Sequence, residues 1–225
     1  MSRYVYSMEL NVENPMMPSS GPAMTLRAHQ TQTILSAAAE GIQAGVVIDS
    51  SEMTMGIPGA GPAPDLSGTT LTFEMGPRGQ VWNVAADGDA DEMAAEVATG
   101  IFEGLDYFRL PETEVAAEDS WTESVPVDLS LGGAAQTVEV EFTYTFAGLE
   151  DSEATITFTG PVASTLDMGG MPANISGELT GSMVVDLAEG RYVRQDNRMS
   201  LEMVVAGMAV PMDLTTALEL VSEPS

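Results

Sequence analysis

The chain has no lysine, no cysteine and only one histidine, His29. Hydrolytic triads, zinc-hydrolase sites and general bases that work near neutral pH usually need histidine, and covalent catalysis often needs cysteine or lysine. We therefore expect that the protein is not an enzyme and holds no cofactor. His29 has no acidic partner near it in sequence, which favours a polar residue on a strand face. The lack of cysteine excludes disulfides and thiolate metal sites.

Basic residues are also scarce. Seven arginines stand against 34 acidic residues, and the formal net charge is -27 at pH 7. Such a charge repels nucleic acid phosphates and anionic membrane surfaces, so we expect direct binding to neither. The pattern favours a solvated acidic surface, with cationic partners or divalent ions as the alternative.

Long apolar runs are absent. No uninterrupted stretch approaches the roughly 18 residues that cross a bilayer, and the first residues lack the apolar core of a signal peptide. The threonine-rich, lysine-free composition is typical of exported bacterial proteins. We expect an extracytoplasmic location, in the periplasm or at the cell surface, with a mature chain that begins at an added Met1; a cytoplasmic protein is the alternative.

Period-two alternation is the dominant pattern in the sequence. Between Thr137 and Phe146, apolar residues alternate with threonine and glutamate, which predicts a strand with one buried face. Residues 153–159 repeat the pattern after a turn in 148–152, and the two form an antiparallel hairpin. The same alternation elsewhere predicts an all-β fold of about 11 strands in a long curved antiparallel sheet, either a half-barrel or a sandwich. The predicted core of the hairpin comprises Val138, Val140, Phe142, Ile156 and Phe158.

One segment has helical spacing instead. Apolar residues recur at helical intervals within residues 89–107, namely Met93, Val97, Ile101, Phe102 and Leu105. The helix separates two strand-rich parts. We predict a single β-rich domain over residues 1–225, and a pseudo-duplication of 1–88 and 110–225 around the helix is compatible with this organisation.

Three alternating aspartates precede the helix. Asp87, Asp89 and Asp91 resemble the start of a calcium loop, in which carboxylates converge on one ion. The sixth position, normally glycine, is Glu92, and the twelfth, normally an acid, is Ala98. Capping of the helix explains the same residues. The cap is the favoured interpretation, and a calcium or magnesium site is the alternative.

Methionine is unusually frequent, with 16 residues. Several are clustered, and clustered thioethers can bind Cu(I) in exported proteins. Packing in a core, or lining an adaptable apolar surface, is the commoner use of methionine. The clusters are Met16 and Met17, Met53 and Met55, Met168 and Met171, and Met203 with Met208 and Met212.

The last strands are the candidate partner or ligand face. Their apolar side chains alternate with polar ones and lie near a chain end, where we expect a sheet edge or an open face that needs a partner. The face comprises Met199, Leu201, Met203, Val205, Met208 and Met212.

Three segments resemble uncharacterised exported bacterial β-sheet proteins. They are Leu110-Pro111 followed by residues 118–122, the hairpin from Tyr144 to Phe158, and residues 181–186 with Glu189-Gly190-Arg191. A long curved sheet with one helix is also distantly similar to the half-barrel of bacterial lipoprotein carriers. That resemblance implies a concave apolar face that holds acyl chains.

These observations favour a non-catalytic protein. We expect an accessory or scaffolding subunit of the bacterial envelope that docks on another protein, including a membrane-bound complex. The alternatives are a carrier or sensor that holds a lipid or other hydrophobic molecule on the methionine-lined face, and copper binding by methionine.

Overall fold

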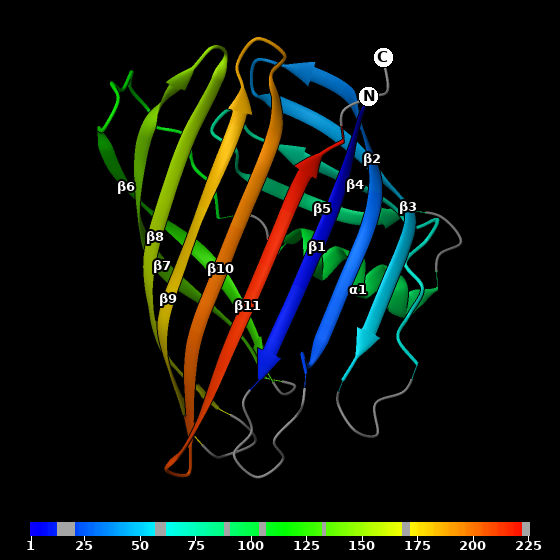
Figure 1. Cartoon of the computed structure of the whole chain (residues 1–225), viewed down its shortest axis with the longest axis vertical. Helices are drawn as coiled ribbons and strands as arrows, with labels where there is room; N and C mark the ends of the chain where they lie inside the picture. Colours follow the sequence, from blue (N-terminus) through cyan, green and yellow to red (C-terminus); the bar gives the residue numbers. More distant parts are fainter. Residues whose placement is uncertain are drawn as a thin grey trace.

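The computed structural model of the chain describes residues 1–12, 21–56, 62–87, 91–103, 107–131, 134–167 and 172–221. Within them, eleven strands and one helix form the fold (Figure 1). The elements are β1 (Ser2–Val12), β2 (Met24–Ala38), β3 (Gly41–Met55), β4 (Thr70–Met75), β5 (Val81–Asp87), α1 (Glu92–Glu103), β6 (Ser120–Leu131), β7 (Ala134–Glu150), β8 (Glu153–Asp167), β9 (Pro172–Asp186), β10 (Arg191–Val205) and β11 (Met208–Leu220).

All eleven strands belong to one sheet. Their order is β5-β4-β3-β2-β1-β11-β10-β9-β8-β7-β6, and the paired neighbours run antiparallel. The first and last strands pair in the middle of the sheet, so the sheet edges are β5 and β6 from the middle of the chain. The predicted all-β class with one helix is confirmed. A single curved sheet makes the half-barrel the correct alternative, not the sandwich.

The β7–β8 hairpin has longer strands than the alternation alone predicts. A bulge between Phe146 and Gly148 interrupts the register, and Gly148 has a φ of 149° there. Glycine tolerates this backbone conformation, so the strand continues past it. The turn is consequently at Asp151 and Ser152, and the prediction that Gly148 begins the turn is wrong.

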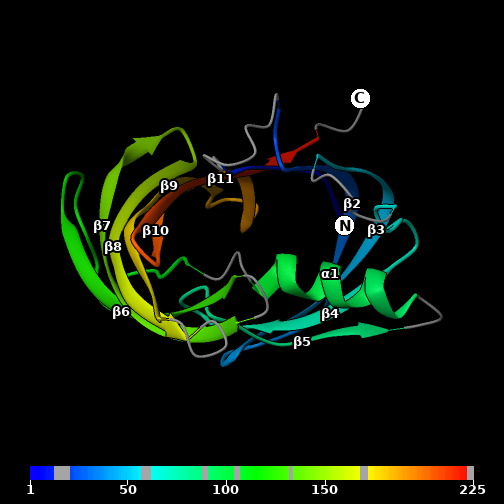
Figure 2. The same ribbon diagram turned by 90° about the horizontal axis from the view of Figure 1, so that it is seen from below.

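The sheet curls around α1, which lies on its concave side beside β5 (Figure 2). Ala94 and Ala98 form the most buried positions of the helix, at 2% and 1% exposure, whereas Met93 is 59% exposed. Met93, one of the apolar residues at helical spacing, therefore lies outside the buried face of the helix. Inside a curved sheet, small alanine side chains allow the helix axis to approach the strands closely. Leu105 lies outside the described residues.

Two buried clusters fill the ends of the curved sheet. One contains the inward side chains of β6 to β9 with Tyr107 and Phe108, and the other contains those of β1 to β4 with α1. In the first cluster, Phe142 packs edge-on against Phe158 at a centroid distance of 5.5 Å. The predicted core of the hairpin is confirmed, with Val138 half-buried at its margin. The described residues form no helix with the length and apolar character that a membrane span requires.

Candidate ligand-binding surface on the inner face of the sheet

A row of apolar side chains crosses five adjacent strands on the inner face. Cross-strand pairing joins Met55 to Met24, Met24 to Leu10, Leu10 to Leu214, and Leu214 to Met199. Directly opposed residues in antiparallel strands point to the same side of the sheet. With strands ~4.8 Å apart, the row extends about 19 Å along the sheet, which is comparable to a long acyl chain.

Further apolar residues adjoin this row on the same face. Together with the row they form what we call the apolar strip, which contains six methionines. Methionine is flexible and polarizable, so a surface rich in it adapts to ligands of different shape. The strip comprises Met8, Leu10, Val12, Met24, Met53, Met55, Met199, Met203, Val205, Val210 and Leu214.

The strip is accessible although it faces inward. Met55 is 39% exposed, and the other ten side chains are half-buried. By contrast, the inward residues Val125, Phe142 and Tyr144 on β6 and β7 are completely buried. Leu10, Met199 and Leu214 lie within their strands and not at the ends, so their exposure is not an effect of a frayed terminus. The protein's own side chains therefore leave this part of the inner face open.

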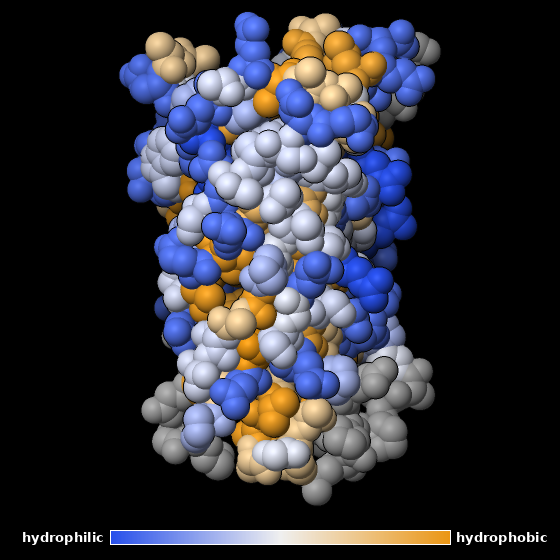
Figure 3. Space-filling view, turned by 90° about the vertical axis from the view of Figure 1, so that its left-hand side faces the viewer, coloured by the Kyte–Doolittle hydropathy of each residue, from blue (hydrophilic) through white to orange (hydrophobic). Residues whose placement is uncertain are grey.

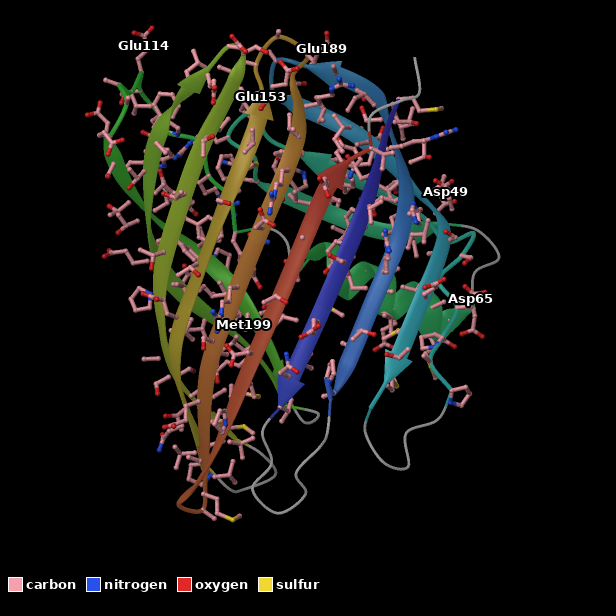
Figure 4. All side chains as sticks on the ribbon, in the orientation of Figure 1. Asp49, Asp65, Glu114, Glu153, Glu189 and Met199 are labelled. Carbon is pink, nitrogen blue, oxygen red and sulfur yellow. The ribbon has the colours of Figure 1, made fainter. Side chains whose placement is uncertain are left out.

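The structure brings together most of the candidate face predicted from the sequence. Met199, Met203 and Val205 are half-buried on the inner face, Leu201 and Met212 are buried beside them, and Met208 is 48% exposed at the tip of the β10–β11 hairpin. Figure 4 shows Met199 in the lower half of β10. The expected sheet edge is wrong, because this hairpin lies in the middle of the sheet, where β11 pairs with β1.

The sequence analysis missed the contribution of the first three strands. Met8 and Leu10 on β1, Met24 on β2, and Met53 and Met55 on β3 share the inner face with the β10–β11 residues. The alternation within β1 and the pairing of Met53 with Met55 in the sequence were the available signals. They did not show which distant strands would be neighbours, because this depends on the pairing of β1 with β11.

A polar pair adjoins the apolar row. Asn197 on β10 pairs with Thr216 on β11, and its Nδ2 donates a hydrogen bond to Thr216 Oγ1 at 3.2 Å. Asn197 is 8% exposed, and its Oδ1 accepts no hydrogen bond within the described part of the protein. A buried acceptor without a donor costs on the order of 1–3 kcal/mol. This atom is therefore a point at which a bound donor would stabilise the protein.

Buried tyrosines near the same face stay neutral. Burial raises the pKa of the Tyr6 hydroxyl well above its ordinary value, with a smaller contribution from Tyr107. Burial also raises the pKa of Tyr4, whose hydroxyl donates a hydrogen bond to the Tyr192 carbonyl oxygen at 3.3 Å. Both hydroxyls are uncharged near neutral pH. They make the inner face beside the strip locally polar but add no negative charge to it.

Acidic residues gather at the upper end of the molecule. Figure 4 places Glu114, Glu153 and Glu189 there, on the turns and connections opposite the lower part of the sheet. Exposed apolar residues lie at both ends, as the side view of Figure 3 shows, and Leu149 and Leu187 at the upper turns are 57% and 60% exposed. The β10–β11 hairpin ends at the lower end in Figure 1, and its tip residues Ala206, Gly207, Met208 and Ala209 are exposed.

The outer face offers a different kind of hollow. A groove of about 680 Å³ crosses β2, β1, β11, β10 and β9. Its lining includes outward residues such as Glu9, Asp196 and Arg198, together with the row of Met8, Thr216 and Asn197 between them. Arg198 and Ser200 both donate hydrogen bonds to Asp213 Oδ1, at 3.0 and 2.8 Å. The charged side chains at this open groove make it less suited to a hydrophobic ligand than the apolar strip.

The aspartates before the helix take different positions. The Asp91 carboxylate accepts a hydrogen bond from the Met93 backbone N–H at 3.0 Å and a longer one from that of Ala94, so it caps α1. Asp87 ends β5, and Asp89 lies outside the described residues. Among the described residues, no three histidine or acidic side chains come together as a metal site. The capping interaction accounts for Asp91, and the metal site stays a prediction.

Comparison with known proteins gives a family without an assigned role. The model of a family of unknown function, DUF6263, matches residues 107–191. All three segments that resemble uncharacterised proteins fall inside this range, so that resemblance is confirmed. No curated protein matches the chain.

One solved structure that is similar to this chain is described as "Lipid-protein interactions in lipovitellin". The identity is 13% and the TM-score is 0.57, over 98% of this chain and 25% of that chain. The protein thus spans about a quarter of the length of the lipovitellin chain. At this identity the likeness concerns the fold alone, and it agrees with the expected distant similarity to lipid-carrier sheets.

Proposed function

We propose that the protein binds a hydrophobic molecule with a long acyl or alkyl chain on the apolar strip, as a carrier or sensor. The observation that carries this proposal is the half-exposed methionine-rich row inside a curved sheet. Burial of apolar surface gains about 25 cal/mol per Å². A ligand that covers Met24, Leu214 and Met199 at once would therefore bind mainly through the hydrophobic effect.

The likeness to a lipid-binding protein structure supports this proposal at the level of fold. The ligand would lie across β3, β2, β1, β11 and β10, along the row from Met55 to Met199.

Dye binding tests this proposal with a matched pair of variants. Met199→Gln with Leu214→Gln puts amides on the inner face, whereas Ser200→Gln with Thr215→Gln changes the neighbouring exposed residues on the outer face. We expect the wild-type protein to bind the uncharged dye N-phenyl-1-naphthylamine saturably. The inner pair should weaken binding about tenfold or more, and the outer pair should leave it unchanged.

Thermal unfolding of each variant, together with dye binding below its transition, separates loss of the site from loss of the fold. Saturable binding that the inner and outer pairs affect equally would place the dye elsewhere and contradict the proposal. So would an absence of dye binding by the wild-type protein. Native mass spectrometry of protein from its own host then identifies any retained lipid by mass.

A further inference from the structure

The row next to the apolar strip contains a polar group that is positioned to select the ligand. Register places Asn197 between Thr216 on β11 and Gly181 on β9, and Thr216 is in turn opposite Met8 on β1. The following row contains Met199, Leu214 and Leu10. Asn197 therefore lies at the boundary of the strip, one step along the strand from its central methionine.

A hydrogen bond to Thr216 fixes the orientation of the Asn197 side-chain amide. Its Nδ2 donates to Thr216 Oγ1, which holds the amide plane across β10 and β11. The Oδ1 atom accepts no hydrogen bond from the described residues, and the residue is 92% buried. A leucine of nearly the same size would fill this position without leaving a polar atom unsatisfied. The amide has a chemical use that a leucine would lack, which is to accept a hydrogen bond.

The side chains around Asn197 decide which kind of hydrogen-bond donor can bind to its Oδ1. The inward side chains of the two rows are uncharged. They are Met53, Leu26, Met8, Thr216, Asn197 and Gly181 in one row, and Met55, Met24, Leu10, Leu214, Met199 and Leu179 in the other. An anionic headgroup would have no partner there and would face the partial negative charge of Oδ1. Burial of an unpaired charge is strongly unfavourable.

We propose that Asn197 Oδ1 is the polar anchor of the ligand site and selects amphiphiles whose polar group is a neutral hydrogen-bond donor, a hydroxyl or an amide N–H. This inference rests on the proposed function. The alkyl chain lies along the apolar strip, and the donor at its end bonds to Oδ1 once the side chains that bury this atom move aside. Thr216 is a positioning residue, because its hydroxyl orients the Asn197 amide without contacting the ligand.

Matched ligands with a twelve-carbon chain test the selection through displacement of N-phenyl-1-naphthylamine. Dodecan-1-ol and its methyl ether both have an oxygen at the same position, but only the alcohol donates a hydrogen bond. We expect the wild-type protein to bind the alcohol about tenfold more tightly than the ether, as one well-formed hydrogen bond predicts. Dodecanamide, tested in parallel, distinguishes an N–H from a hydroxyl donor, and dodecanoate above pH 8 should bind less tightly than the alcohol.

Substitution of the anchor should remove the preference. In Asn197→Leu, the ratio of alcohol to ether affinity should fall to about one, while the ether binds at least as well as in the wild type. The melting temperature should stay the same or rise, because an unsatisfied buried carbonyl is removed. Thr216→Val should reduce the ratio in the same direction, and Thr215→Val on the outer face should not change it.

The outcomes separate this inference from the proposed function. If the dye and dodecane bind but the wild type shows no preference for the alcohol, or prefers the ether, the anchor is wrong and the hydrophobic site stands. A preference that persists in Asn197→Leu also overturns the anchor. If no apolar probe binds, both proposals fail. Should Asn197→Leu not fold, the Asn197 side-chain amide resonance of the wild type must shift with the alcohol and not with the ether.

Discussion

Arg78 and Glu123 form an ion pair that joins the two opposite edges of the sheet. Arg78 belongs to the turn between β4 and β5, and Glu123 is an inward residue of β6. The same guanidinium donates to the Leu110 carbonyl oxygen at 2.8 Å and to Glu112 at 3.0 Å. The Leu110 backbone N–H donates in return to the Arg78 carbonyl oxygen at 2.8 Å. These contacts hold the β5 end and the β6 end of the curved sheet close to each other.

The first prediction is that this contact contributes more to stability than an ordinary surface ion pair. Arg78→Gln should lower the free energy of unfolding by about 1–3 kcal/mol, because three charge-assisted hydrogen bonds are lost at a partly buried site. Arg194→Gln, which breaks an exposed pair with Asp196, should cost less than about 1 kcal/mol. Urea unfolding measures both. Equal effects of the two variants would show that Arg78 does not hold the edges together.

The second prediction concerns the two faces of β7. Phe142 is completely buried and contacts Phe158, whereas its neighbour Glu141 is exposed. Phe142→Ala should cost about 3–5 kcal/mol through the cavity that it leaves. Glu141→Ala should change stability by no more than about 0.5 kcal/mol. Chemical denaturation of both variants would refute the assignment of faces if Glu141→Ala were the more damaging change.

Strand positions and faces of this kind could be predicted from the sequence, because they depend on local periodicity. The alternation around Phe142 identifies a strand with one buried side, and the helical spacing near Val97 identifies the helix. The same reasoning predicted an all-β fold of about 11 strands. Each of these inferences needs only residues close together in the chain.

The features that decide the site depend on contacts between distant residues. Local alternation does not show that β1 pairs with β11, and this pairing is what places Leu10 beside Leu214. It also places the β10–β11 hairpin in the middle of the sheet and not at an edge. Nothing in the sequence distinguishes Asn197 from other polar strand residues, because its unsatisfied Oδ1 is found only when its neighbours are placed. The predicted extracytoplasmic location and the docking on a protein partner stay predictions.

The third prediction tests the close packing over β8. A methyl group at Gly160 would lie 2.5 Å from Phe142 Cδ1 and 2.8 Å from Val140 Cγ1. Gly160→Ala should therefore cost about 1–3 kcal/mol through overpacking. Gly45 is a matched control in β3, because its nearest neighbour would be 3.5 Å away at Leu35. Gly45→Ala should be neutral or slightly stabilising.

A double-mutant cycle identifies the cause of the Gly160 effect. If the Phe142 ring is the obstacle, Gly160→Ala should cost clearly less in a Phe142→Ala background than in the wild type. Equilibrium unfolding of the four proteins gives the coupling energy. Strict additivity of the two changes would show that the glycine is needed for a reason other than the neighbouring ring.

The fourth prediction is a pH dependence on the outer face. The Ser200 hydroxyl and then the Arg198 guanidinium donate hydrogen bonds to Asp213, and they lower the pKa of its carboxyl below the ordinary value of 3.8. A carboxyl with a lowered pKa in the folded state stabilises the protein above the unfolded pKa. This contribution disappears as the pH falls through the folded value.

Asp213→Asn should therefore destabilise the protein at pH 7, by no more than about 1 kcal/mol, because the pair is largely exposed. The difference in unfolding free energy between wild type and variant should shrink once the pH falls below about 4, where the unfolded carboxyl takes up its proton. Urea unfolding at pH 7, 5 and 3 measures this difference and cancels the general effect of acid on a chain with a charge of -27. Ser200→Ala should make the Asp213→Asn change smaller at pH 7, because it removes one of the two hydrogen bonds that the Asp213 carboxylate accepts. A difference that stays constant down to pH 3 would mean that the charge of Asp213 does not stabilise the β10–β11 pair.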